Sequence, residues 1–203
     1  MSSVNLSVYS SVMRVILRLI HSPHEEWEAI VERSKDTDDV RRDFFFPCLT
    51  IVIVVSILSS IIHYHWSEMI YFTQFMQFMG RNLLILFATL FFGVITTSFC
   101  LSWVVKRRRF DVEEEAFPRC FTLAVYASSI MWMLMLVENL IPSLFFLPVL
   151  NLYVVYVVWV GLPILFPSIS MDEAKQYWMT LIAILLLILI PMGVNKVIKF
   201  LIS

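Results

Sequence analysis

The sequence predicts an all-α membrane protein, a polytopic bundle of five transmembrane helices preceded by short N-terminal amphipathic helices. Of its 203 residues, 60% are hydrophobic and only 15% are charged, whereas a soluble domain has about a quarter of its residues charged and about half apolar. The apolar residues fall in blocks close to the ~20 residues that a helix needs to cross a bilayer. The basic residues divide unevenly between the intervening segments, as they do in multi-pass membrane proteins.

The first amphipathic segment covers residues 8–20. Its polar stripe contains Arg14 and Arg18, and apolar residues occupy the rest of the helical surface. This pattern suits a helix in the membrane interface with its arginines near anionic headgroups. The alternative is the first helix of a packed cytoplasmic subdomain.

A second short helix is expected to begin at Pro23. Ser22 is followed by proline at the first helical position and by Glu25 three residues after the cap, which is a capping box. The expected apolar face of this helix comprises Trp27, Ile30 and Val31. The polar run 32–43 is expected to be a solvated connector, so the chain divides into an N-terminal region, 1–43, and a membrane domain, 44–203.

The spans follow from the positions of the apolar blocks. Residues 67–80 carry glutamine and glutamate among helically spaced apolar residues, which predicts an amphipathic piece on the far surface. Pro191 is expected to kink the last span, with Lys196 and Lys199 beyond its end. The five spans are expected at about residues 44–62, 82–105, 118–137, 144–166 and 177–194.

The orientation follows from the basic residues, because cytoplasmic loops of membrane proteins are enriched in lysine and arginine. With five spans and a cytoplasmic N-terminus, only Arg81, Lys196 and Lys199 of the 15 basic residues lie outside. We therefore expect the N-terminus in the cytoplasm and the C-terminus outside. Because the sequence shows no organelle signal, we expect the membrane to be the inner membrane of a bacterium. The twelve basic residues on the cytoplasmic side are Arg14, Arg18, Arg33, Lys35, Arg41, Arg42, Lys106, Arg107, Arg108, Arg109, Arg119 and Lys175.

Glu138, with Asn139 beside it, is the candidate functional site inside the membrane region. An ionisable residue within a bilayer is costly and often marks a proton or ion site. The alternative is structural, because Ile141-Pro142 follows and the carboxylate then sits at a helix end near interfacial water. The serine cluster formed by Ser56, Ser59 and Ser60 is expected to serve helix packing, since small polar residues let membrane helices approach.

No other chemistry is predicted. The sequence has no CxxC or HExxH motif and no catalytic combination of serine with histidine or of paired aspartates. We therefore expect no enzyme activity, no catalytic residues, no cofactor and no metal. The one compact basic run, Lys106 to Arg109, adjoins an apolar block and does not indicate a nucleic-acid partner.

Several residues, in this order within a five-span layout, resemble the YIP domain family of membrane proteins in its short prokaryotic form. They are Ser22-Pro23, Trp27, Ile30, Pro47, Tyr126-Ala127-Ser128, Pro142, Tyr153, Tyr156, Gly161-Leu162 and Ala174. The resemblance covers about residues 20–195 and implies five spans, a cytoplasmic N-terminus and a role in membrane organisation or trafficking. Some members bind Rab-type GTPases, but the N-terminal region here has only about forty residues, which argues against that partner.

The sequence thus leaves two hypotheses for function. The first is a non-enzymatic protein of the YIP type that interacts with the bilayer lipids and with other membrane proteins or with itself. Its cytoplasmic interaction surface is expected at Pro23, Trp27, Ile30, Arg107, Arg108 and Arg109. The second is a small transporter or channel subunit for an ion or small solute that uses Glu138.

Overall fold

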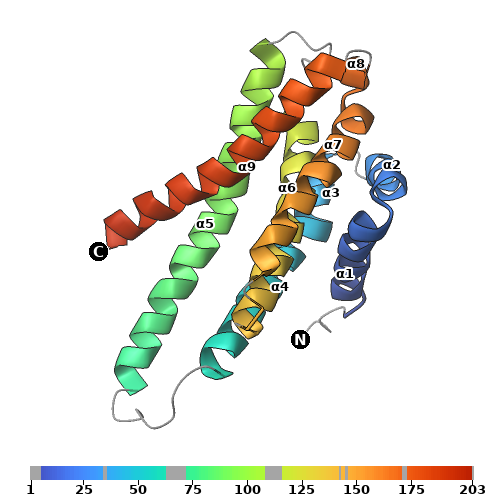
Figure 1. Ribbon diagram of the computed structural model, residues 1–203. Helices are drawn as coiled ribbons and strands as arrows, with labels where there is room; N and C mark the ends of the chain where they lie inside the picture. The colour runs from blue at the N-terminus through green and yellow to red at the C-terminus, as the bar shows by residue number, and fades with distance from the viewer. Residues whose placement is uncertain are drawn as a thin grey trace.

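The computed structural model describes residues 6–33, 36–62, 72–107, 116–141, 143–144, 146–170 and 173–202. The described part is almost wholly helical and contains no strand (Figure 1). In chain order its helices are α1 (Leu6–His21), α2 (Pro23–Arg33), α3 (Thr37–Val40), the π-helical turn η1 (Arg41–Phe45), α4 (Phe46–Ile62), α5 (Phe72–Arg107), α6 (Ala116–Leu140), the 3-10 helix η3 (Leu147–Leu152), α7 (Tyr153–Leu165), α8 (Pro167–Ser170) and α9 (Glu173–Ile202).

Five helical segments among the described residues are long and apolar enough to cross a membrane, which confirms the predicted fold class. They are Thr37–Ile62, Met76–Arg107, Ala116–Leu140, Leu147–Leu165 and Glu173–Ile202. α6 is the most buried of these and forms the centre of the bundle, whereas α9 is the least buried. The apolar side chains that α9 leaves uncovered suit contact with lipid, as membrane spans require.

The first span begins earlier than the sequence predicts. The expected connector is wrong from Thr37 onward, because α3, η1 and α4 form one continuous helical segment. Asp36 starts it as the N-cap, with its carboxylate accepting a hydrogen bond from the Thr37 amide at 2.6 Å. Phe44 and Phe45 of the π-helical turn are both buried in the core.

The predicted amphipathic piece at 67–80 is wrong for the residues that the structure describes. Residues 72–80 are the first turns of α5, which continues without a break to Arg107. Residues 63–71 lie outside the described part of the chain. A helix of 36 residues is about 54 Å long, so it exceeds the roughly 30 Å of the hydrocarbon core.

The last span also extends beyond the prediction. α9 continues through Pro191 to Ile202, so Lys196 and Lys199 belong to the helix and do not follow it. The missing amide hydrogen of a proline costs a helix one hydrogen bond but does not always end it. α9 crosses α5 and packs against it, and Pro191 meets Gly93 there, where an added β-carbon would lie 3.3 Å from the proline ring.

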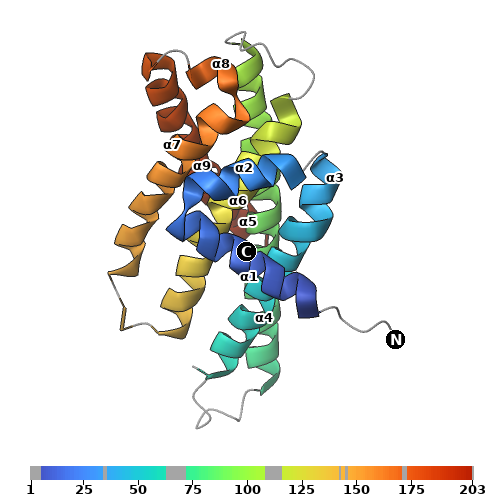
Figure 2. The same cartoon turned by 90° about the vertical axis from the view of Figure 1, so that its right-hand side faces the viewer.

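The two N-terminal helices pack against the membrane bundle. α1 contacts α4 and α6, and α2 contacts α7, so the pair lies across one face of the spans (Figure 2). α1 buries one apolar face against this surface, formed by Val12, Val15, Ile16 and Leu19. The predicted amphipathic helix is therefore present, and its apolar face contacts protein.

Candidate functional site

Trp27 holds the N-terminal helices to the spans. α2 begins at Pro23, as the sequence predicts, with the fixed φ of proline suited to a first helical position. One turn later the Trp27 side chain is fully buried, and its indole Nε1 donates a hydrogen bond to the Val157 carbonyl oxygen of α7 at 3.0 Å. The only polar group of a buried tryptophan is thus satisfied, as burial demands.

Gly161 makes this contact accessible. In an α-helix the carbonyl of residue 157 points along the axis toward residue 161, whose side chain would normally shield it. A β-carbon added to Gly161 would lie 2.5 Å from Cε2 and 2.7 Å from Nε1 of Trp27. The glycine therefore leaves the space that the indole fills.

Two aromatic side chains complete the pocket around Trp27. The Tyr126 ring of α6 meets the indole edge-on, with ring centroids 5.9 Å apart. Phe44 covers Tyr126 from η1 at a centroid separation of 4.1 Å. Such aromatic pairs stabilise a core beyond the area they bury. We call Trp27, Phe44, Tyr126, Val157 and Gly161 the Trp27 junction, since it joins α2 to three parts of the bundle.

Two polar contacts also fix the position of α1. The Tyr153 hydroxyl of α7 donates a hydrogen bond to the Ile20 carbonyl oxygen in the last turn of α1 at 2.6 Å. Glu26 of α2 is only 3% exposed, and its carboxylate pairs with Arg18 of α1 at 3.8 Å and also with Arg33. A nearly buried carboxylate requires such partners, because desolvating an unpaired charge is expensive.

We expect Glu26→Gln to loosen the contact between α1 and α2. Gln keeps the shape of the side chain but loses the charge that Arg18 and Arg33 neutralise. Since hydrogen bonds to charged groups contribute about 1.5–3 kcal/mol, the thermal midpoint of the detergent-purified protein should fall. Glu28→Gln is the control because that carboxylate is exposed on the same helix. An equal fall in both variants would contradict the role of Glu26.

The expected interaction surface is only partly exposed. Pro23, Trp27 and Ile30 are buried, so the prediction that they form a surface is wrong, because their apolar side chains pack into the bundle. Arg107 is exposed at the end of α5, with its guanidinium 5.1 Å from the centre of the Trp103 ring. Arg108 and Arg109 lie outside the described residues.

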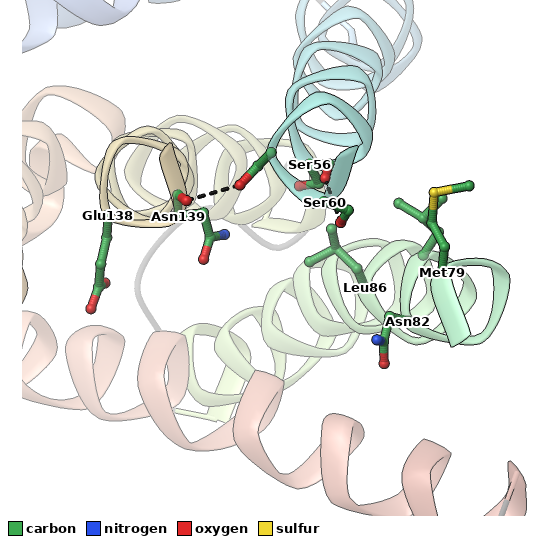
Figure 3. Close-up of a pocket in the computed structure, with 9 residues that line it drawn as sticks. Ser56, Ser60, Met79, Asn82, Leu86, Glu138 and Asn139 are labelled. Atoms are coloured by element: carbon green, nitrogen blue, oxygen red, sulfur yellow. Dashed lines mark hydrogen bonds between the residues drawn. The ribbon is translucent and has the colours of Figure 1, made fainter. Parts of the chain in front are cut away.

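Glu138 lies in the last turn of α6, half-buried, and lines a cavity of about 590 Å³. α4 contributes three serines to this cavity, and α5 contributes Asn82 and an apolar wall. Figure 3 shows Glu138 and Asn139 extending from the end of α6, with Ser56 and Ser60 on the neighbouring helix. The Ser59 hydroxyl donates to the Asn139 carbonyl oxygen at 2.8 Å and so joins α4 to α6. We call this cavity the Glu138 pocket.

The sequence singled out Glu138 and Asn139 but missed their neighbours in the pocket. The serines of α4 were expected to serve helix packing, and Ser59 does join two helices. Their spacing at 56, 59 and 60 places all three on one helical face. This spacing could have predicted a polar site on α4. Asn82 gave no such signal, because only the folded bundle brings α5 beside α6.

The order of Trp27, Tyr126, Tyr153 and Gly161 in the sequence suggested a family, and the structure brings all four to the contact between the N-terminal helices and the spans. The Yip1 domain family matches the chain over residues 17–194. The chain belongs to the Yip1 domain family. This confirms the resemblance and makes the protein an integral, multi-pass membrane protein. Searches of curated proteins and of solved structures each found no match.

The matched region of this Yip1 domain contains both the Trp27 junction and the Glu138 pocket. It also contains a second cavity, of about 540 Å³, between α7 and α9. Apolar side chains such as Val155, Leu181 and Ile188 line most of it. An apolar cavity on spans that face lipid suits contact with acyl chains.

Proposed function

We propose that this Yip1 domain protein is non-enzymatic and acts in membrane organisation, by binding lipids and other membrane proteins or a second copy of itself. We further propose a bacterial inner membrane location with the N-terminus in the cytoplasm. The single observation that carries the lipid interaction is the outer surface of α1. The split of the basic residues supports the orientation.

α1 has an exposed apolar edge beside an exposed basic edge. Met13, Leu17 and Ile20 remain 38%, 60% and 42% exposed, at the spacing of one helical face. Arg14 follows Met13 and Arg18 follows Leu17, and both arginines are exposed. A helix docked on the spans with apolar and cationic edges turned outward can place its apolar edge among acyl chains and its arginines at headgroup phosphates.

We expect Arg14→Gln to weaken retention of an anionic lipid. A basic residue near a membrane surface contributes about 1 kcal/mol to the attraction of anionic lipid, which corresponds to about a fivefold change in affinity. Arg14 is the better target because Arg18 also pairs with Glu26. The measurement is the phosphatidylglycerol that co-purifies with the full chain from mixed vesicles, quantified by mass spectrometry.

Arg81→Gln is the matched control, since Arg81 is equally an exposed arginine but lies in the early turns of α5. We expect its lipid retention to equal that of the unmodified protein. Equal retention by both variants would contradict lipid binding through α1.

The alternative role, transport through Glu138, has less support. A transport path needs polar groups that are free to bind the solute along the bundle. The buried hydroxyls of Ser98 and Ser129 instead donate to carbonyl oxygens of their own helices, at 2.7 Å each. Such bonds satisfy these two hydroxyls without a solute. Thr89 and Thr97 of α5 bury hydroxyls that have no partner among the described residues, but neither residue lines the Glu138 pocket.

A further inference from the structure

The cavity of about 540 Å³ between α7 and α9 is a groove on the outside of the bundle. Val155 and Trp159 of α7 form one wall, and one face of α9 forms the other. Leu181, Leu185 and Leu189 of that face are each about half exposed, so the groove opens to the surroundings of the spans. We call it the α7–α9 groove.

A hydrogen bond ties the two walls together at the Trp159 end of the groove. Pro163 has no N–H group, so the Trp159 carbonyl oxygen one turn earlier in α7 lacks its usual helical donor. The Gln176 side chain of α9 donates a hydrogen bond to this oxygen at 3.0 Å. The groove is therefore built into the fold and is present without an occupant.

The α9 wall is almost wholly apolar. Thr180 is buried, and its hydroxyl donates to the Gln176 carbonyl oxygen of its own helix at 2.9 Å. Beyond Thr180, the α9 residues described in the lining are all leucine or isoleucine. A water molecule needs about two to four polar partners, which this wall does not supply. The groove therefore suits an apolar occupant.

A lipid chain fits the groove better than the helix of a partner protein. Membrane helices pack through small residues such as glycine, alanine and serine, which let two backbones approach. Gly93 has this role inside the bundle, where α5 meets Pro191 of α9. The described lining of the α7–α9 groove contains none of these three residue types. Its branched and aromatic side chains keep a second helix at a distance, whereas a thin, flexible chain can follow the furrow between them.

The length of the groove matches one leaflet of a bilayer. From Tyr177 to Leu189 α9 rises about 18 Å, close to the roughly 15 Å of hydrocarbon that one leaflet contributes. Tyr177 and its neighbour Trp178 are exposed at one end, and aromatic residues of these types gather at the membrane interface. The groove thus extends from an interface toward the middle of the bilayer.

We propose that the α7–α9 groove binds one acyl chain of a phospholipid from the leaflet in which α9 begins. The carboxyl end of the chain lies at Tyr177, whose hydroxyl donates to the ester carbonyl oxygen, and the methyl end lies at Leu189. The proposal rests on the lipid interaction proposed above and deepens it, but the groove shares no residue with α1.

The test maps where a bound chain lies. The full chain is reconstituted in phosphatidylcholine vesicles with a small fraction of phosphatidylcholine that carries a photoreactive diazirine, either near the carboxyl end or near the methyl end of one chain. Peptide mass spectrometry then locates the crosslinks. We expect the first probe to label α9 around Tyr177 and Leu181, and the second to label it around Ile188 and Leu189.

Phe99 of α5 is the internal control for bulk lipid. It is 58% exposed and does not line the groove. It lies at a similar depth to Leu185, because Gly93 meets Pro191 and the two helices run in opposite directions (Figure 1). We expect stronger labelling of the groove than of Phe99. Equal labelling would mean bulk lipid only, and weaker labelling would mean that a second copy of the chain covers the groove; either result overturns the proposal.

Three variants locate the binding. Ile184→Trp fills the groove and should reduce its labelling about fivefold or more, and Tyr177→Phe should reduce it about twofold or more by removing the hydroxyl. Val197→Trp, at an exposed position of α9 outside the groove, should leave it unchanged.

Undiminished labelling of Ile184→Trp, or the same crosslinked positions for both probes, also overturns the proposal. The two probes on the unmodified chain decide it even where a variant does not fold. Because these vesicles contain no anionic lipid, failure here is distinguishable from failure of the Arg14 test.

Discussion

Replacing Gly161 with alanine is expected to separate α2 from α7. The new β-carbon would overlap the Trp27 indole, with a closest approach of 2.5 Å. The indole is fully buried against Tyr126, so moving it requires its neighbours to repack. Overpacking a core costs about 1–3 kcal/mol, and the displaced indole also loses its hydrogen bond to Val157. We expect the thermal midpoint to fall and hydrogen–deuterium exchange of α2 amides to rise.

Gly193→Ala provides the control for the Gly161 substitution. Gly193 also lies in a membrane helix, but a β-carbon there meets no atom within 4 Å. Alanine is favoured over glycine in a helix by about 1 kcal/mol, so this variant should be at least as stable as the unmodified protein. Fast exchange in α2 for both variants, or for neither, would contradict the fit between Gly161 and Trp27.

The five spans were predictable because each is a long apolar run. In lipid, an α-helix lets such a run make all of its backbone hydrogen bonds within itself. The ends of the spans were harder to predict. Thr37 to Asp43 is rich in charge, yet it is helical, since ion pairs such as Arg41–Asp38 at 2.6 Å join successive turns. Local pairs of this kind stabilise a helix that hydropathy alone places outside the membrane.

The position of the N-terminal helices could not be read from their pattern. Amphipathic spacing shows that α1 and α2 bury one face, but lipid tails and a bundle interior are both apolar. The expected surface at Trp27 and Ile30 was wrong for this reason. What distinguishes the two environments is a partner 130 residues away, the Val157 carbonyl, and no local pattern reports such a contact.

The Glu138 pocket was predictable in part. The sequence predicted a site at Glu138 and Asn139 because a carboxylate lies near the end of a membrane helix, and both residues line the cavity. Their partners come from α4 and α5, and the bond from Ser59 to Asn139 joins residues 80 positions apart. Assigning the pocket therefore required the packing of three helices.

Trp27→Ala is expected to give the largest loss of stability in the protein. Truncating a buried aromatic side chain to alanine costs about 3–5 kcal/mol through lost contacts and the cavity that remains. Tyr126 loses its edge-on partner, and the Val157 carbonyl loses its donor. Hydrogen–deuterium exchange should rise through both α1 and α2, because α1 contacts α2.

Trp27→Phe separates the two contributions of the indole. Phe keeps an aromatic ring against Tyr126 but has no N–H group. The variant should therefore lose the roughly 1 kcal/mol of one hydrogen bond, plus a smaller amount because the phenyl ring fills less volume than the indole. Trp178→Ala is the matched control, because Trp178 is 61% exposed on α9 and its truncation leaves no internal cavity. If Trp178→Ala destabilises the protein as much as Trp27→Ala, tryptophan content rather than the Trp27 junction sets the stability. If only Trp27→Ala does so, the buried indole contributes more to stability than an exposed tryptophan, and it holds α2 on α7 beside the contacts that α1 makes with α4 and α6.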